Sequence, residues 1–122
     1  MKYSVAITGW GEDALSFLEM EDMNSLIIFN DNAPAELAEI CVLHTQAQLA
    51  ADPEPGDTLK ICGKSYTITA VGDEAKHTLR ELGHCTLTFR ADTEPDRPGC
   101  IMLDGEMFTP DDVKQGGLIE IC

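Results

Sequence analysis

The chain has 122 residues, of which 43% are hydrophobic, and its 22 acidic and 8 basic side chains give a formal net charge of −14. This length and apolar content predict a single domain spanning residues 1–122. The negative charge argues against binding to nucleic acid or to an anionic membrane surface, because both would repel the chain. It favours a basic protein partner.

Membrane insertion and secretion are not expected. The apolar stretches are all shorter than the roughly 20 residues that cross a bilayer. The segment Met1–Val5 reads as the start of a strand and not as a signal peptide. The cysteines are odd in number and scattered, at Cys41, Cys62, Cys85, Cys100 and Cys122. Disulfide pairing among them stays open, but their positions are better explained if they are small buried hydrophobic residues with free thiols. Free thiols are typical of a reducing compartment, so we expect a cytoplasmic protein.

Short strands account for most of the chain, because apolar runs and alternating segments are bounded by Gly, Asn or Asp. In chain order they are expected at Tyr3–Thr8, Leu26–Phe29, Thr58–Cys62, Tyr66–Val71, Cys85–Arg90, Ile101–Leu103 and Leu118–Ile121. Gly63 and Lys64 predict a hairpin between the third and the fourth. Pro55–Ile61 and Gln115–Ile121 both run from a glycine turn into an alternating strand, a weak echo that suits a pseudo-symmetric barrel.

Three helical pieces interrupt these strands. They are expected at Glu12–Met20, at Ala35–Glu39 after Pro34, and at Glu74–Leu82 with Asp73 as its N-cap and Gly83 as its stop. Strands at this density are typical of sandwiches and barrels. The predicted fold is mainly β, a barrel-like single domain with two or three short helices.

Three histidines are the main candidates for chemistry. His44 ends the apolar run Ile40–Leu43, where we expect a rigid scaffold that solvent still reaches. Its imidazole is partly a neutral nucleophile near pH 7. The competing interpretation is a hydrogen-bonded structural histidine at a strand end, and position alone favours it. His84 enters a strand directly after Gly83 and carries the same two interpretations. His77 lies off the apolar face of the third helix and is expected to be solvated.

Other chemistries find little support. Zinc ligands at paired short spacing are missing, and adjacent strand residues such as His84 and Cys85 face opposite sides. The nucleophile elbow G-x-S-x-G and the phosphate loop G-x-x-x-x-G-K are also missing. We therefore expect no metal and no cofactor. A histidine that transiently carries a phosphoryl group fits better, since it needs one ring nitrogen free, the other held by a hydrogen bond, and donors for the oxyanions.

Two blocks of the sequence carry a family resemblance. The first, Ala33–His44, ends on the candidate histidine, and the second comprises Thr69–Gly72, Leu79–His84 and the strand Cys85–Phe89. They closely resemble the glucitol/sorbitol-specific EIIA component of the bacterial phosphoenolpyruvate-dependent sugar phosphotransferase system. The likeness extends at lower density over nearly the whole chain.

The resemblance implies a mostly β, barrel-like phosphotransferase component of the cytoplasm. It implies that His44 is the phosphohistidine, which accepts the phosphoryl group from HPr and passes it to the EIIB domain of the EIIB/EIIC sorbitol transporter. By analogy with other EIIA families, we hypothesise that His84 packs near His44 and steadies the phosphoryl oxygens. Arg80, Lys64 and Lys114 are candidates for balancing its charge.

One alternative belongs to another class of function. It is a non-catalytic acidic binding or regulatory module on the same fold, in which His44 is structural. The sequence leaves open the sugar, the phosphorylated ring nitrogen and the oligomeric state. The loop Asp92–Pro98 follows the family pattern loosely and is expected to bear on partner preference.

Overall fold

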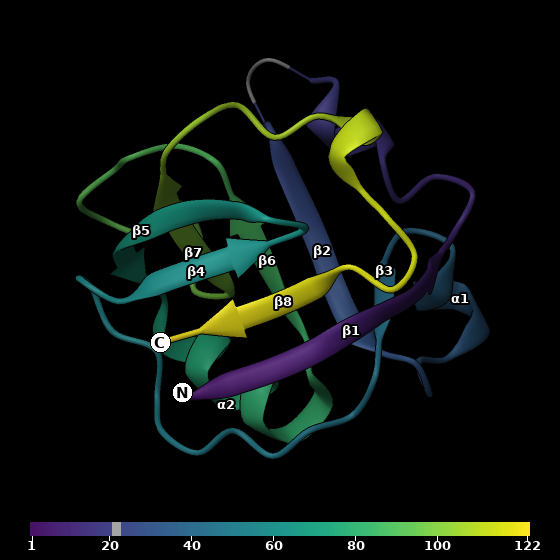
Figure 1. Cartoon of the computed structure of the whole chain (residues 1–122), viewed down its shortest axis with the longest axis horizontal. Helices are drawn as coiled ribbons and strands as arrows, with labels where there is room; N and C mark the ends of the chain where they lie inside the picture. Colours follow the sequence, from purple (N-terminus) through teal and green to yellow (C-terminus); the bar gives the residue numbers. More distant parts are fainter. Residues whose placement is uncertain (21–22) are drawn as a thin grey trace.

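The computed structural model describes residues 1–20 and 23–122. The described residues form a closed β-barrel in the order β1-β3-β2-β6-β7-β5-β4-β8 (Figure 1). The strands are β1 Tyr3–Trp10, β2 Ser25–Asn30, β3 Val42–His44, β4 Thr58–Ile61, β5 Lys64–Val71, β6 Cys85–Thr88, β7 Cys100–Asp104 and β8 Leu118–Ile121. The helices are α1 Ala35–Ala38 and α2 Asp73–Leu82, with 3-10 turns at Ser16–Leu18 and Pro110–Asp112. The predicted mainly β barrel is confirmed.

The barrel interior is filled by alternate residues of the strands. On β1, Tyr3, Val5 and Ile7 are each 2% exposed, whereas the residues between them are exposed or half-buried. This is the period of two that a strand with one buried face requires. Burial of about two dozen apolar side chains, from the strands and from the segments that pack on them, provides the main free energy of folding.

Three sequence predictions need correction. The segment Glu12–Met20 is mostly turns with one 3-10 helix, because the N–H groups of Gly11 and Asp13 donate to Cys41 and Glu39 and so tie its start to the chain before β3. The N-cap of α2 is Gly72, and Asp73 is its first helical residue. The β4–β5 hairpin turns at Cys62 and Gly63, with φ of 50° and 85°, one residue earlier than predicted.

The barrel has an internal two-fold pseudo-symmetry. From the β4–β8 pair, the strand order runs β4-β5-β7-β6 in one direction and β8-β1-β3-β2 in the other. Each half contains one parallel pair, β2–β3 or β6–β7, and one bulged antiparallel pair, β1–β3 or β5–β7. The two halves of the chain, β1–β4 and β5–β8, therefore fold alike.

The sequence repeats with the structure. Ile-Thr, Gly, Ala and Leu recur at one spacing in Ile7–Leu18 and Ile68–Leu79. Gly11 and Gly72 hold equivalent places, where a β-carbon would collide with the backbone of the segment before β3 or β7. This repeat is stronger than the echo read from Pro55–Ile61, whose strand β4 lies beside its equivalent β8.

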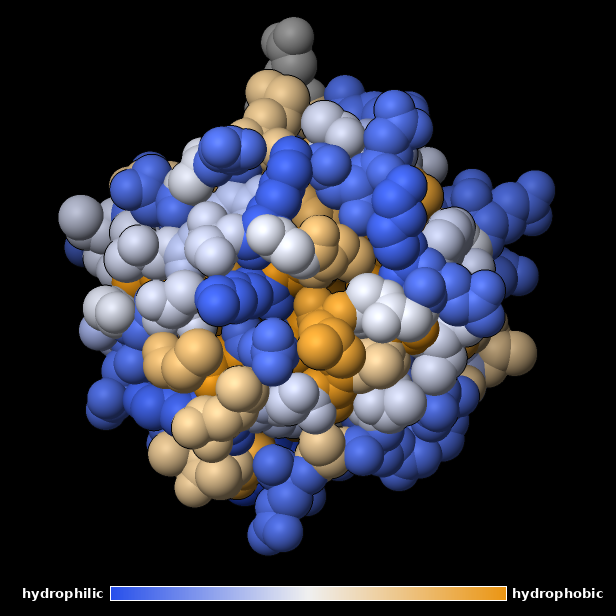
Figure 2. Space-filling view, in the orientation of Figure 1, coloured by the Kyte–Doolittle hydropathy of each residue, from blue (hydrophilic) through white to orange (hydrophobic). Residues whose placement is uncertain are grey.

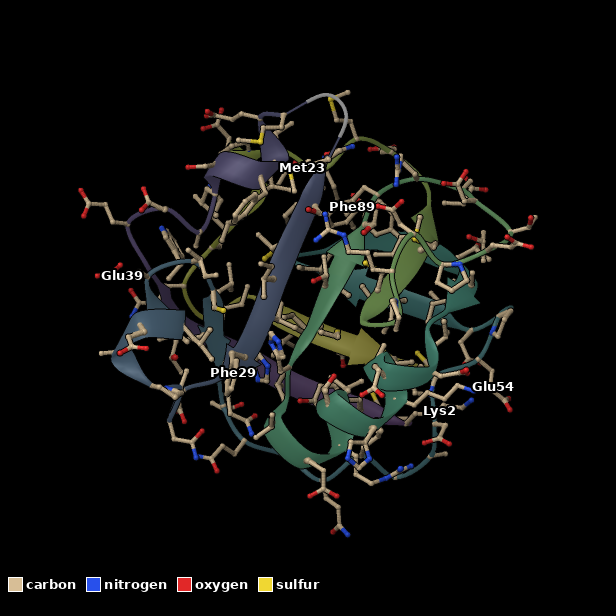
Figure 3. The ribbon with its side chains drawn as sticks, turned by 180° about the vertical axis from the view of Figure 1, so that it is seen from behind. Lys2, Met23, Phe29, Glu39, Glu54 and Phe89 are labelled. Atoms are coloured by element: carbon tan, nitrogen blue, oxygen red, sulfur yellow. The ribbon has the colours of Figure 1, made fainter. Side chains whose placement is uncertain are left out.

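Register identifies the equivalent residues at the two ends of the barrel. His44 pairs with Ile7 beside the β1 bulge, as Leu103 pairs with Ile68 beside the β5 bulge. On the neighbouring parallel strand, the same alignment makes Asn30 equivalent to Phe89, the first residue after β6. Because β2 and β6 are antiparallel, these places lie at opposite ends of the barrel, as the labelled Phe29 and Phe89 do in Figure 3.

All five cysteines are free thiols, and Cys41, Cys85 and Cys100 are buried. Burial raises the pKa of Cys41 to about 11, so its thiol stays protonated and unreactive at neutral pH. In the described residues, no helix is long and apolar enough to cross a membrane.

Candidate functional site

The His44 side chain points into one end of the barrel. It lies on the last residue of β3, between Ile7 of β1 and Asn30 of β2, and its exposed fraction is 0%. The Tyr3 ring meets it edge-on, with 6.2 Å between the ring centroids. The expectation that solvent reaches this imidazole is therefore wrong for this conformation, because β3 turns the ring inward with Val42.

Both ring nitrogens of His44 face carbonyl oxygens. Nδ1 lies 2.8 Å from the oxygen of Thr45, and Nε2 lies 2.8 Å from the oxygen of Gly83. A carbonyl oxygen accepts hydrogen bonds and cannot donate, so a ring nitrogen that carries a proton donates it to the carbonyl that it faces. Both nitrogens are covered by these carbonyls in this arrangement, and neither is open to an incoming phosphoryl group.

Gly83 forms the lid over this ring. It ends α2 with φ of 62°, and its N–H donates to the carbonyl of Leu79 at 3.0 Å. A β-carbon there would lie 2.8 Å from Cε1 of His44 and would collide with the Asn30 carboxamide. Only glycine allows this left-handed turn and this close approach together. The predicted helix stop is confirmed, and it also covers the histidine.

His84 continues from this lid into β6. Its Nδ1 lies 3.1 Å from the carbonyl oxygen of Ile28, and its ring stacks at a tilt on Phe29, with 4.7 Å between centroids. The side chain is half-buried. His44 and His84 thus belong to one cluster joined through Gly83, although each ring packs against a different aromatic side chain.

Asn30 completes the cluster, and sequence reasoning missed it by treating Asn30 as a turn residue. Its Oδ1 is buried and has no hydrogen-bond partner among the described residues. We call His44, Asn30 and Gly83 the histidine end. The equivalent aromatic end contains Leu103, Phe89, Tyr66 and Phe108, in which Phe89 and Phe108 stack with centroids 5.0 Å apart. The contrast between the two ends follows from the strand register and not from the sequence repeat.

Comparison with known proteins identifies the family. The family model "PTS system glucitol/sorbitol-specific IIA component" matches residues 2–120. The chain belongs to this family. It is 36% identical over 118 residues to the PTS system glucitol/sorbitol-specific EIIA components of Escherichia coli K12 and Shigella flexneri, covering 97% of this chain and 92% of each relative. Membership assigns it a general role in phosphotransfer.

A solved structure supports the fold. The crystal structure of the PTS system IIA component from Enterococcus faecalis V583 superposes with a TM-score of 0.73 at 25% identity, over 97% of this chain and 98% of that one. The barrel described above is thus similar to that of another IIA component.

The remaining site predictions fall outside the histidine end of this EIIA component. His77 is exposed on α2, as predicted. Arg80 pairs with Asp52, and Lys64 pairs with Asp112 at 2.9 Å. Lys114 helps to line a hollow beside β4 and β8, together with Lys60, Cys62 and Leu118.

Figure 2 shows the face that carries β4, β8 and β1, with apolar atoms at its centre among hydrophilic ones. In residues 1–20 and 23–122, no three His, Cys, Asp or Glu side chains gather to hold a metal ion.

Proposed function

We propose that this EIIA component is a phosphohistidine carrier. It accepts a phosphoryl group from HPr on His44 and passes it to the EIIB domain of a sorbitol transporter. The observation that carries this proposal is the polar pair His44 and Asn30, which stands where the other half of the barrel has Leu103 and Phe89. Apolar residues suffice to close a barrel end, so the polar pair calls for a reason other than packing.

Phosphorylation requires one ring nitrogen to be uncovered. We propose Nε2, because Nδ1 faces the carbonyl of the next residue in its own segment, whereas Nε2 faces Gly83 on a separate element. A shift of the corner between α2 and β6 releases Nε2 while the bond from Nδ1–H to Thr45 holds the tautomer. That corner must withdraw, since a phosphoryl group on Nε2 would meet the carbonyl oxygen of Gly83.

The transfer itself is an in-line displacement. The Nε2 lone pair of neutral His44 attacks the phosphorus of the donor's phosphohistidine, and a new N–P bond forms as the donor's N–P bond breaks. The released electron pair returns to the donor imidazole, which takes a proton from solvent. Positioning supplies most of the catalysis. We place His84 as a support that steadies the phosphoryl oxygens.

The charge around the site suits a basic donor. Asp31 follows Asn30, and α1 adds Glu36 with Glu39 at its end, all exposed. Opposite charge steers association, and salt screens that attraction. The rate of phosphoryl transfer from HPr should therefore fall as ionic strength rises.

Incubation with phosphoenolpyruvate, enzyme I and HPr tests the site. Wild-type protein should gain one acid-labile phosphoryl group by intact mass, and His44→Ala should gain none. His77→Ala is the matched control, because His77 is an exposed histidine on α2, and it should label like wild type. An adduct that persists in His44→Ala would show that the site is misassigned. A wild-type protein that never labels would favour the non-catalytic module.

His84 has its own test in the same assay. His84→Ala should label more slowly or lose its phosphoryl group sooner, while the position of the label stays at His44. Unchanged kinetics and lifetime would dismiss its supporting role. Phosphorus NMR of the adduct separates attachment at Nε2 from attachment at Nδ1, and a signal for Nδ1 would overturn the choice of nitrogen.

A further inference from the structure

We propose that Asn30 is a phosphoryl-binding residue, whose carboxamide donates a hydrogen bond to the group that His44 carries. This inference rests on the proposed function and adds a residue to it. Asn30 lies directly beside His44, because the two residues are register partners on the parallel strands β2 and β3. Partners in a parallel pair project to the same side of the sheet.

The position of the carboxamide relative to the ring supports this role. A β-carbon placed on Gly83 would collide with both the Asn30 carboxamide and Cε1 of His44, so both side chains lie against one point. Cε1 is the ring carbon between Nδ1 and Nε2. The Asn30 carboxamide, which lies beside Cε1, is therefore close to a phosphoryl group on either ring nitrogen. The inference holds whether Nδ1 or Nε2 is phosphorylated.

The hydrogen bonding of Asn30 is incomplete in the unphosphorylated protein. Its Oδ1 is buried with no partner among the described residues. An unpartnered buried polar atom costs about 1–3 kcal/mol, so such an atom calls for an explanation. A half-turn of the carboxamide puts the Nδ2 donor in the place of Oδ1. Nδ2 can then donate a hydrogen bond to a phosphoryl oxygen.

The other end of the barrel shows what packing alone selects. At the equivalent place, Phe89 is 8% exposed, and its ring lies 5.1 Å from Tyr66 between centroids. The basic side chains named as candidates for neutralising the phosphoryl group pair with carboxylates instead, Arg80 with Asp52 and Lys64 with Asp112. A neutral amide donor beside His44 fits a site that must bind a dianion and then release it.

The test compares Asn30→Leu and Asn30→Asp with Asn32→Ala, an exposed asparagine in the same turn, as control. Each protein is phosphorylated by HPr and, separately, by phosphoramidate, which loses ammonia as its P–N bond breaks and bypasses protein docking. Asn30→Leu should react about 100-fold more slowly with both donors, as when an oxyanion donor is removed. Asn30→Asp should react more slowly still, because it adds negative charge. Asn32→Ala should match wild type.

Stability distinguishes this role from a structural one. Replacing this half-buried amide, whose Oδ1 has no partner among the described residues, by leucine should leave the urea midpoint equal or higher, so the variant loses transfer while it keeps its fold. Wild-type rates in folded Asn30→Leu would overturn the inference and leave the carrier function intact. Slowing with HPr but not with phosphoramidate would place Asn30 in docking and also overturn it. A wild-type protein that labels with neither donor would overturn the carrier function, and this inference with it.

Discussion

At the aromatic end of the barrel, Leu103 and Phe89 fill the places that His44 and Asn30 hold at the histidine end. Strand order, bulges and register are the same, but the contents differ. The aromatic end is closed by packed rings, and burial raises the pKa of Tyr66, whose hydroxyl also has no partner among the described residues, to about 12. The histidine end contains a ring locked between two carbonyls and an unpartnered amide. The same backbone arrangement thus supports one end that stabilises the fold and another end whose polar groups form the candidate functional site.

Exchanging side chains between equivalent places tests that division of roles. The largest effect is expected for Phe89→Asn, which gives the aromatic end the residue of the histidine end. It removes a buried ring stacked on Phe108, so the free energy of unfolding should fall by about 3–5 kcal/mol. Urea denaturation measures this change. A loss below about 1 kcal/mol would mean that the aromatic end contributes little to stability.

The turns before β2 and β6 form a second equivalent pair. Asn24 and Gly83 both have positive φ, 37° and 62°. Gly83→Asn should cost about 2 kcal/mol, because its β-carbon meets Asn30 and His44 although asparagine tolerates positive φ. Asn24→Gly should stay within about 0.5 kcal/mol of wild type. Equal effects of the two swaps, measured by thermal unfolding, would contradict the close fit of Gly83 over the histidine.

Acid sensitivity should arise beside the aromatic end. A hydrogen bond from Lys64 and one from the backbone N–H of Thr109 lower the pKa of Asp112 below its usual value. A carboxylate whose pKa is lower in the folded state than in the unfolded state stabilises the protein at pH values above the unfolded-state pKa. This stabilisation is lost as the pH falls through the folded-state pKa. Asp112→Asn should therefore cost about 1 kcal/mol at neutral pH.

The pH profile of the difference tests that assignment. Unfolding in urea at neutral pH and at about pH 3 should show the gap between Asp112→Asn and wild type shrinking in acid. A gap that stays constant with pH would mean that the Asp112 carboxylate charge does not contribute.

Much of the fold was predictable from local pattern. The mixed apolar and β-branched run Tyr3–Thr8 and the apolar run Leu26–Phe29 predicted strands, because burial of one face or both favours such residues in the sequence. Glu12–Met20 was wrong because long-range bonds from Gly11 and Asp13 override helical spacing. The barrel closure itself depends on pairings that no local pattern encodes.

The candidate site was only partly predictable. His44 was selected by its place after an apolar run, His84 by its place between the Gly83 helix stop and a strand, and both by family resemblance. Burial of His44 was missed, because the cover comes from Gly83 on a distant element. Asn30 was missed because an asparagine after a strand is typical of a turn. The repeat of Ile7–Leu18 in Ile68–Leu79, continued without a gap, aligns Asn30 with Ala91, so its equivalence with Phe89 follows only from the strand register.

Site-resolved detection of the phosphoryl group tests the central claim most directly. After incubation with phosphoenolpyruvate, enzyme I and HPr, the protein is cleaved at neutral or alkaline pH, and its peptides are sequenced by mass spectrometry. We predict a single phosphohistidine at His44, absent from His44→Ala and present in His77→Ala. A label on His84, on His77 or on no histidine would contradict the assignment of the histidine end as the phosphotransfer site.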